Sequence, residues 1–170
     1  TVNFGGADDI LFEIRGRAGI VTLNRPSALN AVNERMVAAL SCALDAWRSN
    51  DAVAHIVLKA EGRAFSAGGD ILDVYEAGRA GQPKPGFFAD EYRLNASIAR
   101  YEKPYVSLID GIVMGGGVGI SGHGSHRVMS EKAVYAMPEV GIGFFPDVGG
   151  SHILSRLPGE FGMYLALTGN

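Results

Sequence analysis

The sequence predicts an α/β fold in which pairs of strands alternate with helices. Short apolar runs suited to strands are followed by segments whose apolar residues recur at helical spacing, and this strand–strand–helix rhythm returns loosely along the chain. The chain has 170 residues, enough to bury a substantial core, and we expect one domain that extends over residues 1–170. The hydrophobic content of 47% and the charged content of 19% are typical of a globular protein.

The first half of the chain predicts a hairpin, a helix and a third strand. Apolar runs at residues 10–14 and 20–23 enclose the segment 15–19 (RGRAG), and this combination signals a hairpin. A helix is expected at 33–48, because its apolar residues fall on one face. These residues are Met36, Val37, Leu40, Leu44 and Trp47. A strand is expected at 55–60 (HIVLKA).

The second half alternates loops and helices around a glycine-rich centre. The expected elements are a loop at 61–70, a short helix at 71–77, a mobile surface loop at 78–86 and a helix at 88–101. The stretch 103–150 then predicts a buried apolar strand, a triple glycine at 115–117, a short helix, a polar strand pair and two acids on Gly/Pro-rich turns. Two further helices are expected at 149–157 and 160–167.

Composition and charge argue against several classes of protein. The net charge is −3 and the basic residues are scattered, which argues against nucleic acid as the main partner. No apolar stretch approaches the roughly 20 residues of a membrane span. The single cysteine, Cys42, excludes an internal disulfide, fits a reducing compartment and is expected to pack as a small side chain in its helix.

The N-terminal region shows no signal or transit peptide. We therefore expect a cytoplasmic protein, or one of the mitochondrial matrix with its transit peptide removed if the source is eukaryotic. The chain starts at Thr1 and not at a methionine, so we expect that residues precede it in the natural protein.

The glycine-rich segment after the apolar strand has several interpretations. Residues 117–122 match the dinucleotide pattern G-x-G-x-x-G, and Glu139 lies at about the distance of its ribose-binding acid. Against this, the helix has room for only about two turns, and Glu139 follows Pro138 on a turn. A P-loop is excluded, because no Lys-Ser/Thr pair follows the glycines. Two further interpretations remain. The glycines either allow close backbone packing, or they form a helix N-terminus whose free N–H groups hold an anion or a developing oxyanion.

A second glycine loop favours the oxyanion interpretation. Residues 66–70 (SAGGD) also lie between a strand and a helix, and Asp70 suits the N-cap of that helix. If the two loops meet, the N–H of Gly69 would face that of Gly116, and both could hold a thioester oxygen as it gains charge. Loss of one such donor costs about 3–4 kcal/mol of transition-state stabilisation.

Two acids, Glu139 and Asp147, stand on turns among apolar neighbours, as catalytic acids do. We expect burial and mutual repulsion to raise their pKa values. The alternative is that both acids merely cap turns. His123 and His126 have no cysteine or further acid nearby to complete a metal site, so we expect structural or surface roles for them and no metal. No serine stands in a G-x-S-x-G elbow, which argues against a serine hydrolase.

Three motifs carry a family resemblance over nearly all of the chain: GRAFSAGGDI (62–71), KPYVSLIDGIVMGGGVGIS (103–121) and YAMPEVGIGFFPDVGG (135–150). They resemble the enoyl-CoA hydratase/isomerase (crotonase) superfamily, and the pair MGGGVG and FPDVGG is most similar to its 3-hydroxyisobutyryl-CoA hydrolase branch. The resemblance implies a spiral of ββα units followed by a C-terminal helical region. That region is absent from this chain, so we expect the chain to be the N-terminal part of a longer protein.

The resemblance also implies roles for single residues. Gly69 and Gly116 match oxyanion-hole positions, Glu139 matches the catalytic glutamate, and Asp147 matches the second catalytic carboxylate of the branch. The positions that match substrate contacts are Glu91, an acid that touches the substrate, and Arg25, Ala28, Leu29, Ala67 and Gly68, which line the path of the CoA nucleotide and pantetheine.

One departure from the hydratase pattern bears on the reaction. Hydratases of this family carry a second glutamate three positions after the middle glycine of the triplet, and here that position is Gly119. The resemblance therefore implies acyl-CoA thioester hydrolysis, in particular of 3-hydroxyisobutyryl-CoA to 3-hydroxyisobutyrate and CoA in valine catabolism. The alternatives are an enoyl-CoA hydratase/isomerase that acts on another acyl-CoA, and a CoA-binding module without turnover.

The resemblance implies few further components. Coenzyme A is part of the substrate, and no separate cofactor is expected. The expected partner is a small-molecule acyl-CoA, and neither nucleic acid nor a membrane is expected to bind. Members of the family often form trimers or dimers of trimers, so the resemblance also implies a homo-oligomer.

Overall fold

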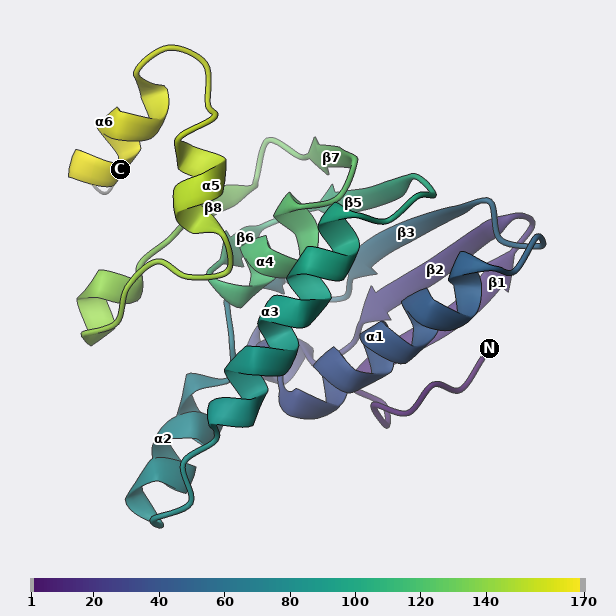
Figure 1. The fold of residues 1–170 in the computed structure, drawn as a ribbon, viewed down its shortest axis with the longest axis horizontal. Coiled ribbons are helices and arrows are strands. Elements are labelled where there is room, and N and C mark those ends of the chain that lie inside the picture. The colour runs from purple at the N-terminus through teal and green to yellow at the C-terminus, as the bar shows by residue number, and fades with distance from the viewer. Residues whose placement is uncertain (1, 169–170) are drawn as a thin grey trace.

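The computed structural model describes residues 2–168, and its elements follow the predicted α/β pattern (Figure 1). The strands are β1 (Ile10–Arg15), β2 (Ala18–Leu23), β3 (His55–Ala60), β4 (Ala64–Ser66), β5 (Tyr105–Ile109), β6 (Ile112–Met114), β7 (His126–Met129) and β8 (Val134–Ala136). The α-helices are α1 (Glu34–Arg48), α2 (Ile71–Arg79), α3 (Pro85–Ala99), α4 (Gly116–Gly122), α5 (Gly150–Leu154) and α6 (Phe161–Thr168). Two short 3₁₀ helices are η1 (Pro26–Ala28) and η2 (Glu139–Ile142).

The larger sheet has five strands in the order β1-β2-β3-β5-β7. The hairpin partners β1 and β2 are antiparallel, whereas β2, β3, β5 and β7 pair in parallel. Parallel neighbours need a crossover connection. Helix α1 connects β2 to β3, and helices α2 and α3 lie between β3 and β5.

A second, smaller sheet explains the rhythm of the sequence. Its three parallel strands have the order β4-β6-β8. Each of them directly follows a strand of the larger sheet, since β4 follows β3, β6 follows β5 and β8 follows β7. Each unit thus places one strand in each sheet before the chain turns into a helix or helical turn, which confirms the expected spiral of ββα units.

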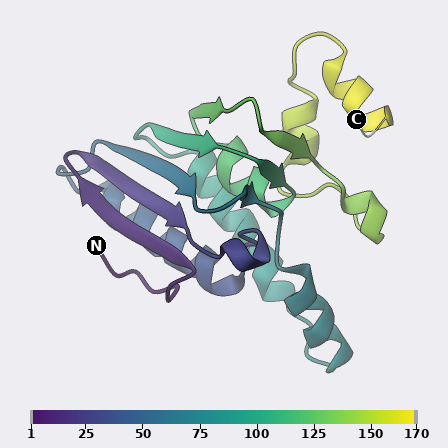
Figure 2. The ribbon, with the colours of Figure 1, turned by 180° about the vertical axis from the view of Figure 1, so that it is seen from behind.

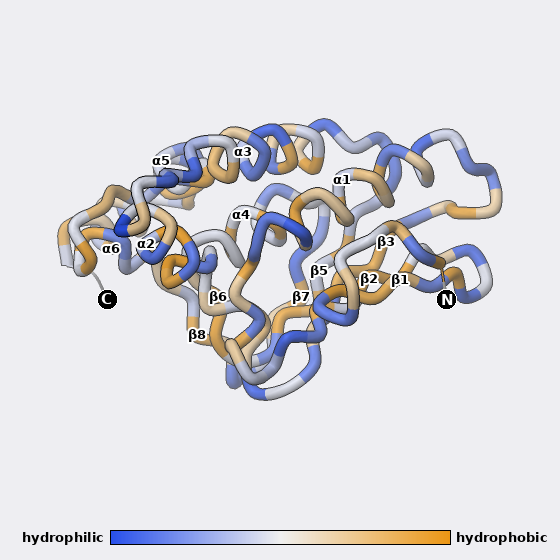
Figure 3. Tube along the Cα trace, turned by 90° about the horizontal axis from the view of Figure 1, so that it is seen from below, coloured by the Kyte–Doolittle hydropathy of each residue, from blue (hydrophilic) through white to orange (hydrophobic). Residues whose placement is uncertain are grey.

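Helices α1, α3 and α4 lie on one side of the larger sheet, as the views from the front, from behind and from below show (Figures 1, 2 and 3). The core lies between these helices and the strands. Trp47 of α1 is 1% exposed, and its ring leaves no room beside Gly19 of β2, where an added Cβ atom would stand 2.7 Å from the ring. Other large side chains that are fully buried include Phe12, Phe65, Leu40, Leu44, Leu58, Leu94 and Tyr105.

Several expected boundaries were wrong. The expected loop 61–70 contains β4, and the apolar strand before the triple glycine is two strands, β5 and β6, separated at Asp110-Gly111. The polar strand pair forms, but β7 joins β5 in the larger sheet and β8 joins β6 in the smaller one. Gly111, with φ +74°, lets the chain pass from one sheet to the other.

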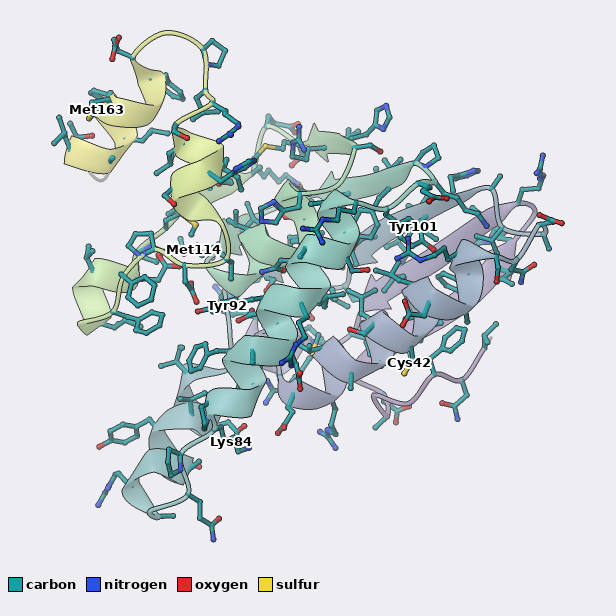
Figure 4. The ribbon with its side chains drawn as sticks, in the orientation of Figure 1. Cys42, Lys84, Tyr92, Tyr101, Met114 and Met163 are labelled. Atoms are coloured by element: carbon teal, nitrogen blue, oxygen red, sulfur yellow. The ribbon has the colours of Figure 1, made fainter. Side chains whose placement is uncertain are left out.

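The expected packing of Cys42 was also wrong, because the side chain is exposed on α1 (Figure 4). It occupies the outward face of a helix whose opposite face carries the predicted apolar residues. Within residues 2–168, no helix has the length and apolar character needed to cross a membrane.

Candidate active site

The first glycine loop connects β4 to α2 and is fixed by its backbone. The N–H of Ala67 donates to the carbonyl of Leu29 (2.9 Å), and the N–H of Asp70 donates to the carbonyl of Val32 (2.9 Å). The Asp70 side chain accepts from the N–H of Asp73, so it caps α2 as predicted. The N–H of Gly69 lies between these anchored positions and does not take part in the bridge to Val32.

The second glycine loop brings the start of α4 against the first. Gly115 has φ +45° and is the N-cap of α4, so the N–H of Gly116 belongs to the first turn, where the helix supplies no acceptor. A Cβ atom on Gly116 would stand 3.0 Å from the nitrogen of Gly69, and one on Gly68 would stand 3.9 Å from the nitrogen of Gly116. The two loops therefore meet in space, and two backbone donors are close enough to bind one oxygen.

Glu139 begins η2 and is buried beside these loops at 7% exposure. Its Oε1 lies 2.9 Å from the point where a Cβ atom on Gly115 would stand. Among the described residues, neither carboxyl oxygen finds a hydrogen-bonding partner in another side chain or loop. Burial raises the pKa of Glu139, its own backbone N–H partly opposes the rise, and the nearby Asp147 adds to it. The expected rise in pKa is confirmed for this acid, whose carboxyl group has no partner in any other described residue.

Glu91 reaches the same place from α3. It is 2% exposed, and its Oε1 lies 2.5 Å from the Cβ position of Gly116 without a hydrogen-bonding partner in the described chain. Burial, followed by repulsion from Asp147, raises the pKa of Glu91 to about 8. At neutral pH this carboxyl group is therefore mainly protonated and can donate a hydrogen bond.

Asp147 is half-buried and differs from the other two acids because its carboxylate has a partner. The hydroxyl of Tyr92 donates to Oδ2 of Asp147 over 2.7 Å, which joins α3 to the turn after η2 (Figure 4 labels Tyr92). Burial, together with this hydrogen bond, raises the pKa of the Tyr92 phenol. The hydroxyl is therefore a donor throughout the neutral range.

Nine of the ten residues proposed from the sequence line one cavity of about 680 Å³, within the usual size of a small-molecule site. They are Arg25, Ala28, Ala67, Gly68, Gly69, Glu91, Gly116, Glu139 and Asp147. Leu29 does not line it and instead holds Ala67 from behind through its carbonyl group. The sequence motifs thus predicted which loops converge, although they lie up to about 120 residues apart.

The sequence places Phe144 among the apolar neighbours of the two acids, but it does not place Phe87 and Phe88 at this cavity. Phe87 and Phe88 from α3 and Phe144 from the turn after η2 line it, and the rings of Phe88 and Phe144 stack at 5.7 Å. Phe87 and Phe88 lie outside the three motifs and far from Phe144 in the chain, so only the fold brings them to it. Arg25 was predicted, but its ion pair with Asp70 (2.6 Å) was not, and this pair connects the η1 segment to the start of α2.

The position of the missing hydratase acid is occupied by neighbours. A Cβ atom on Gly119 would stand 2.8 Å from Cβ of Val148 and 2.9 Å from the side-chain nitrogen of Asn95. Asn95 is 5% exposed, and its amide has no hydrogen-bonding partner within residues 2–168. A larger side chain at 119 cannot enter unless these neighbours move.

Two other expectations are decided by local geometry. Residues 117–122, which match the dinucleotide pattern, lie inside α4 and not in a turn before it, so that interpretation is wrong. His123 donates from Nε2 to the carbonyl of Val148 (2.6 Å), which is the structural role expected. Within the described chain, no three His, Cys, Asp or Glu side chains are grouped as a metal site.

Residues 18–170 match the family model described as enoyl-CoA hydratase/isomerase, and the chain belongs to this family. It is 52% identical over 163 residues to the mitochondrial 3-hydroxyisobutyryl-CoA hydrolase of Danio rerio, covering 95% of this chain and 43% of that protein. The Homo sapiens protein of the same name is 49% identical over 165 residues, with 96% and 43% covered. The chain thus spans less than half the length of these curated relatives.

Solved structures show the same fold. A structure described as a carnitinyl-CoA dehydratase from Mycobacterium thermoresistibile superposes with a TM-score of 0.91 at 50% identity, covering 95% of this chain and 48% of the other. An enoyl-CoA hydratase from Rhodobacter sphaeroides 2.4.1 gives a TM-score of 0.90 at 47% identity, with 95% and 49% covered. The names of these similar proteins include both hydrolases and enzymes that add or remove water.

Proposed function

We propose that the protein is an acyl-CoA thioester hydrolase that converts 3-hydroxyisobutyryl-CoA to 3-hydroxyisobutyrate and CoA, a step of valine catabolism. The observation that supports this most strongly is the convergence of two backbone donors and one unpaired buried acid on one cavity. The N–H groups of Gly69 and Gly116 would hold the thioester carbonyl oxygen, and Glu139 lies beside them. The identity of about half to curated hydrolases of this name supports the choice of substrate.

The two N–H groups form the oxyanion hole of the proposed mechanism. As the carbonyl carbon is attacked, negative charge moves onto the oxygen, and fixed donors stabilise it without reorganising. Both N–H groups are fixed in advance. Gly69 lies between Ala67 and Asp70, whose N–H groups donate to the carbonyls of Leu29 and Val32, and Gly116 belongs to the first turn of α4.

Glu139 has two possible roles in the same reaction. As a nucleophile, its carboxylate attacks the thioester carbon, the C–S bond breaks, CoA leaves as the thiolate and takes up a proton, and water hydrolyses the mixed anhydride. As a general base, it removes a proton from the attacking water, and the same C–S bond breaks. Both routes require ionised Glu139, and its raised pKa makes that carboxylate more reactive once it is formed.

The other two acids would position the substrate and the water. Asp147 orients the attacking water or the 3-hydroxyl group of the acyl chain. Glu91 is mainly protonated at neutral pH, because burial raises its pKa to about 8, and it contacts the substrate beside Gly116. Arg25, Ala28, Ala67 and Gly68 line the part of the cavity proposed for CoA, while Leu29 supports Ala67.

Gly119 argues against hydration as the reaction. Adding water across a double bond uses two acids on one water, and the position of the second is filled by Val148 and Asn95. A hydratase/isomerase that acts on another acyl-CoA is the second candidate, because solved structures at 47–50% identity carry hydratase and dehydratase names. A CoA-binding module without turnover is the third.

The wider setting follows from the same proposal. Similar proteins are named mitochondrial, so we propose the mitochondrial matrix for a eukaryotic source and the cytoplasm for a bacterial one. We propose an acyl-CoA as the binding partner, without nucleic acid, membrane or separate cofactor, and a homo-oligomer as the assembly.

The test uses the full-length protein and two substrates. Release of free thiol is followed with 3-hydroxyisobutyryl-CoA, and loss of the enoyl absorbance is followed with crotonyl-CoA. The proposal predicts thiol release and no loss of the enoyl signal. The reverse result would identify a hydratase, and CoA binding without either signal would support the binding module.

A further inference from the structure

The turn that carries Asp147 has a backbone that ordinary residues avoid. Val148 has φ +43° and Gly149 has φ +82°, so two successive residues are left-handed. A β-branched residue such as Val148 is a rare occupant of this region. Val148 is nevertheless 4% exposed, so the turn is packed against the protein. Such a conformation persists only where the surroundings enforce it.

Two side chains from different helices hold this turn. The Tyr92 hydroxyl donates to the carboxylate of Asp147 from α3 (2.7 Å), and His123 at the end of α4 donates to the carbonyl of Val148 (2.6 Å). The imidazole also lies against Gly149, where a Cβ atom would stand 2.6 Å from its Cε1. Both ends of the left-handed segment are therefore anchored.

Gly119 of α4 packs directly against the turn. The Val148 side chain fills the space that a Cβ atom at 119 would need, with only 2.8 Å between the two positions. Tyr92 and Asn95 lie within one turn of α3, so this helix contacts both Asp147 and Gly119. Tyr92, Gly119 and His123 thus each contact the turn at a different point.

Tyr92 stands outside the cavity that holds the acids. It lines a second cavity, of about 560 Å³, and Asp147 borders both cavities. The phenol therefore binds Asp147 without lining the space proposed for the substrate, and its ring lies 6.3 Å from that of Phe88. A residue in this place acts through Asp147.

We propose that Tyr92 is a positioning residue. Together with His123 and Gly119, which contact the same turn, it holds the Asp147 carboxylate at the reaction cavity. This inference rests on the proposed hydrolase function. It explains why Gly119 and Asp147 occur together, because the turn that presents Asp147 occupies the space of a larger residue at 119.

The test removes the phenolic oxygen of Tyr92 and keeps its ring. In the full-length protein, Tyr92→Phe is expected to lower kcat/KM for 3-hydroxyisobutyryl-CoA about tenfold, because misplaced catalytic groups lose rate steeply. The matched control is Tyr101→Phe, which removes a 2.8 Å hydrogen bond to Leu44 outside the site and is expected to keep the wild-type rate. Equal rates for Tyr92→Phe and wild type would overturn the proposal.

A double variant separates positioning from a general structural loss. If Tyr92 acts through Asp147, adding Tyr92→Phe to Asp147→Ala causes no further decrease in rate. If the two losses multiply, the proposal is wrong. A wild-type protein that hydrolyses no acyl-CoA would refute the proposed function. Thermal unfolding of wild type, Tyr92→Phe, Asp147→Ala and the double variant then tests whether Tyr92 acts through Asp147. Tyr92→Phe must lower Tm by less beside Asp147→Ala than alone, and equal shifts would overturn the inference.

Discussion

The backbone nitrogen of Gly69 lies 3.0 Å from the point where a Cβ atom on Gly116 would stand. The same point is 2.5 Å from Oε1 of Glu91, so a methyl group there meets a donor on one side and an acid on the other. This contact between two loops that lie 47 positions apart in the chain (69 and 116) defines the site. It also makes position 116 the most direct place to block the proposed oxyanion hole.

Gly116→Ala keeps its backbone N–H, but we expect the added methyl group to displace that donor and lower kcat by about 10²–10³-fold, the usual loss when one oxyanion donor no longer acts. The added methyl group would stand 3.0 Å from the Gly69 nitrogen and 2.5 Å from Oε1 of Glu91, so the two loops must move apart. Steady-state thiol release measures the effect. Gly78→Ala is the matched control, because that glycine stands in α2 with no atom near its Cβ position. Similar rates for both variants would contradict the assignment of the oxyanion hole.

Glu91 makes the stability of the fold depend on pH. Its pKa rises from the usual 4.5 to about 8 because the side chain is buried, with a further contribution from Asp147. Between these two values the unfolded chain has released the proton and the folded chain keeps it, so stability falls as pH rises. Glu91→Gln cannot ionise, and it should reduce this fall by up to about 4 kcal/mol between pH 5 and pH 9, since each pKa unit corresponds to about 1.4 kcal/mol.

Denaturant unfolding of both proteins across this range measures the difference. The exposed Glu131→Gln controls for the loss of one negative charge. If Glu91→Gln follows the wild-type curve, the buried acid is not the source of the pH dependence.

Gly119→Glu would restore the acid of the hydratase pattern, but we expect no hydration of crotonyl-CoA. The new side chain would overlap Val148 and the Asn95 amide, so the turn that carries Asp147 must move. Overpacking of this kind destabilises by about 1–3 kcal/mol. The expected outcome is a lower Tm and weaker thiol release. A variant that gains hydratase activity at wild-type stability would show that the space at 119 is open.

Much of the fold was predictable because its signals are local. The helical spacing of Met36, Leu40 and Leu44 predicts α1 within one residue, and β3 was predicted at its observed bounds. The sheet partners of β7 and β8 were not predictable. Strands of four and three residues are too short for their sequence to indicate which strand they pair with. The split into two sheets depends on three short turns, at residues 61–63, 110–111 and 130–133, which carry no common sequence signal.

The site was predictable as far as its motifs extend. The two glycine loops and the acids Glu139 and Asp147 stand in recognisable segments, and the structure brings them to one cavity. Tyr92 and Asn95 were not found, because nothing in the sequence of α3 shows which residues face a turn some 50 positions away. Leu29 was placed on the cavity because its neighbours belong there, whereas its side chain does not line it.

We propose that Glu139 performs the chemistry of thioester hydrolysis. The most direct measurement is thiol release from 3-hydroxyisobutyryl-CoA by full-length wild type and Glu139→Gln, with CoA binding measured in parallel. Loss of a general base or nucleophile of this kind should lower kcat by about 10²–10⁴-fold while binding remains. A variant that releases thiol at the wild-type rate would contradict the account.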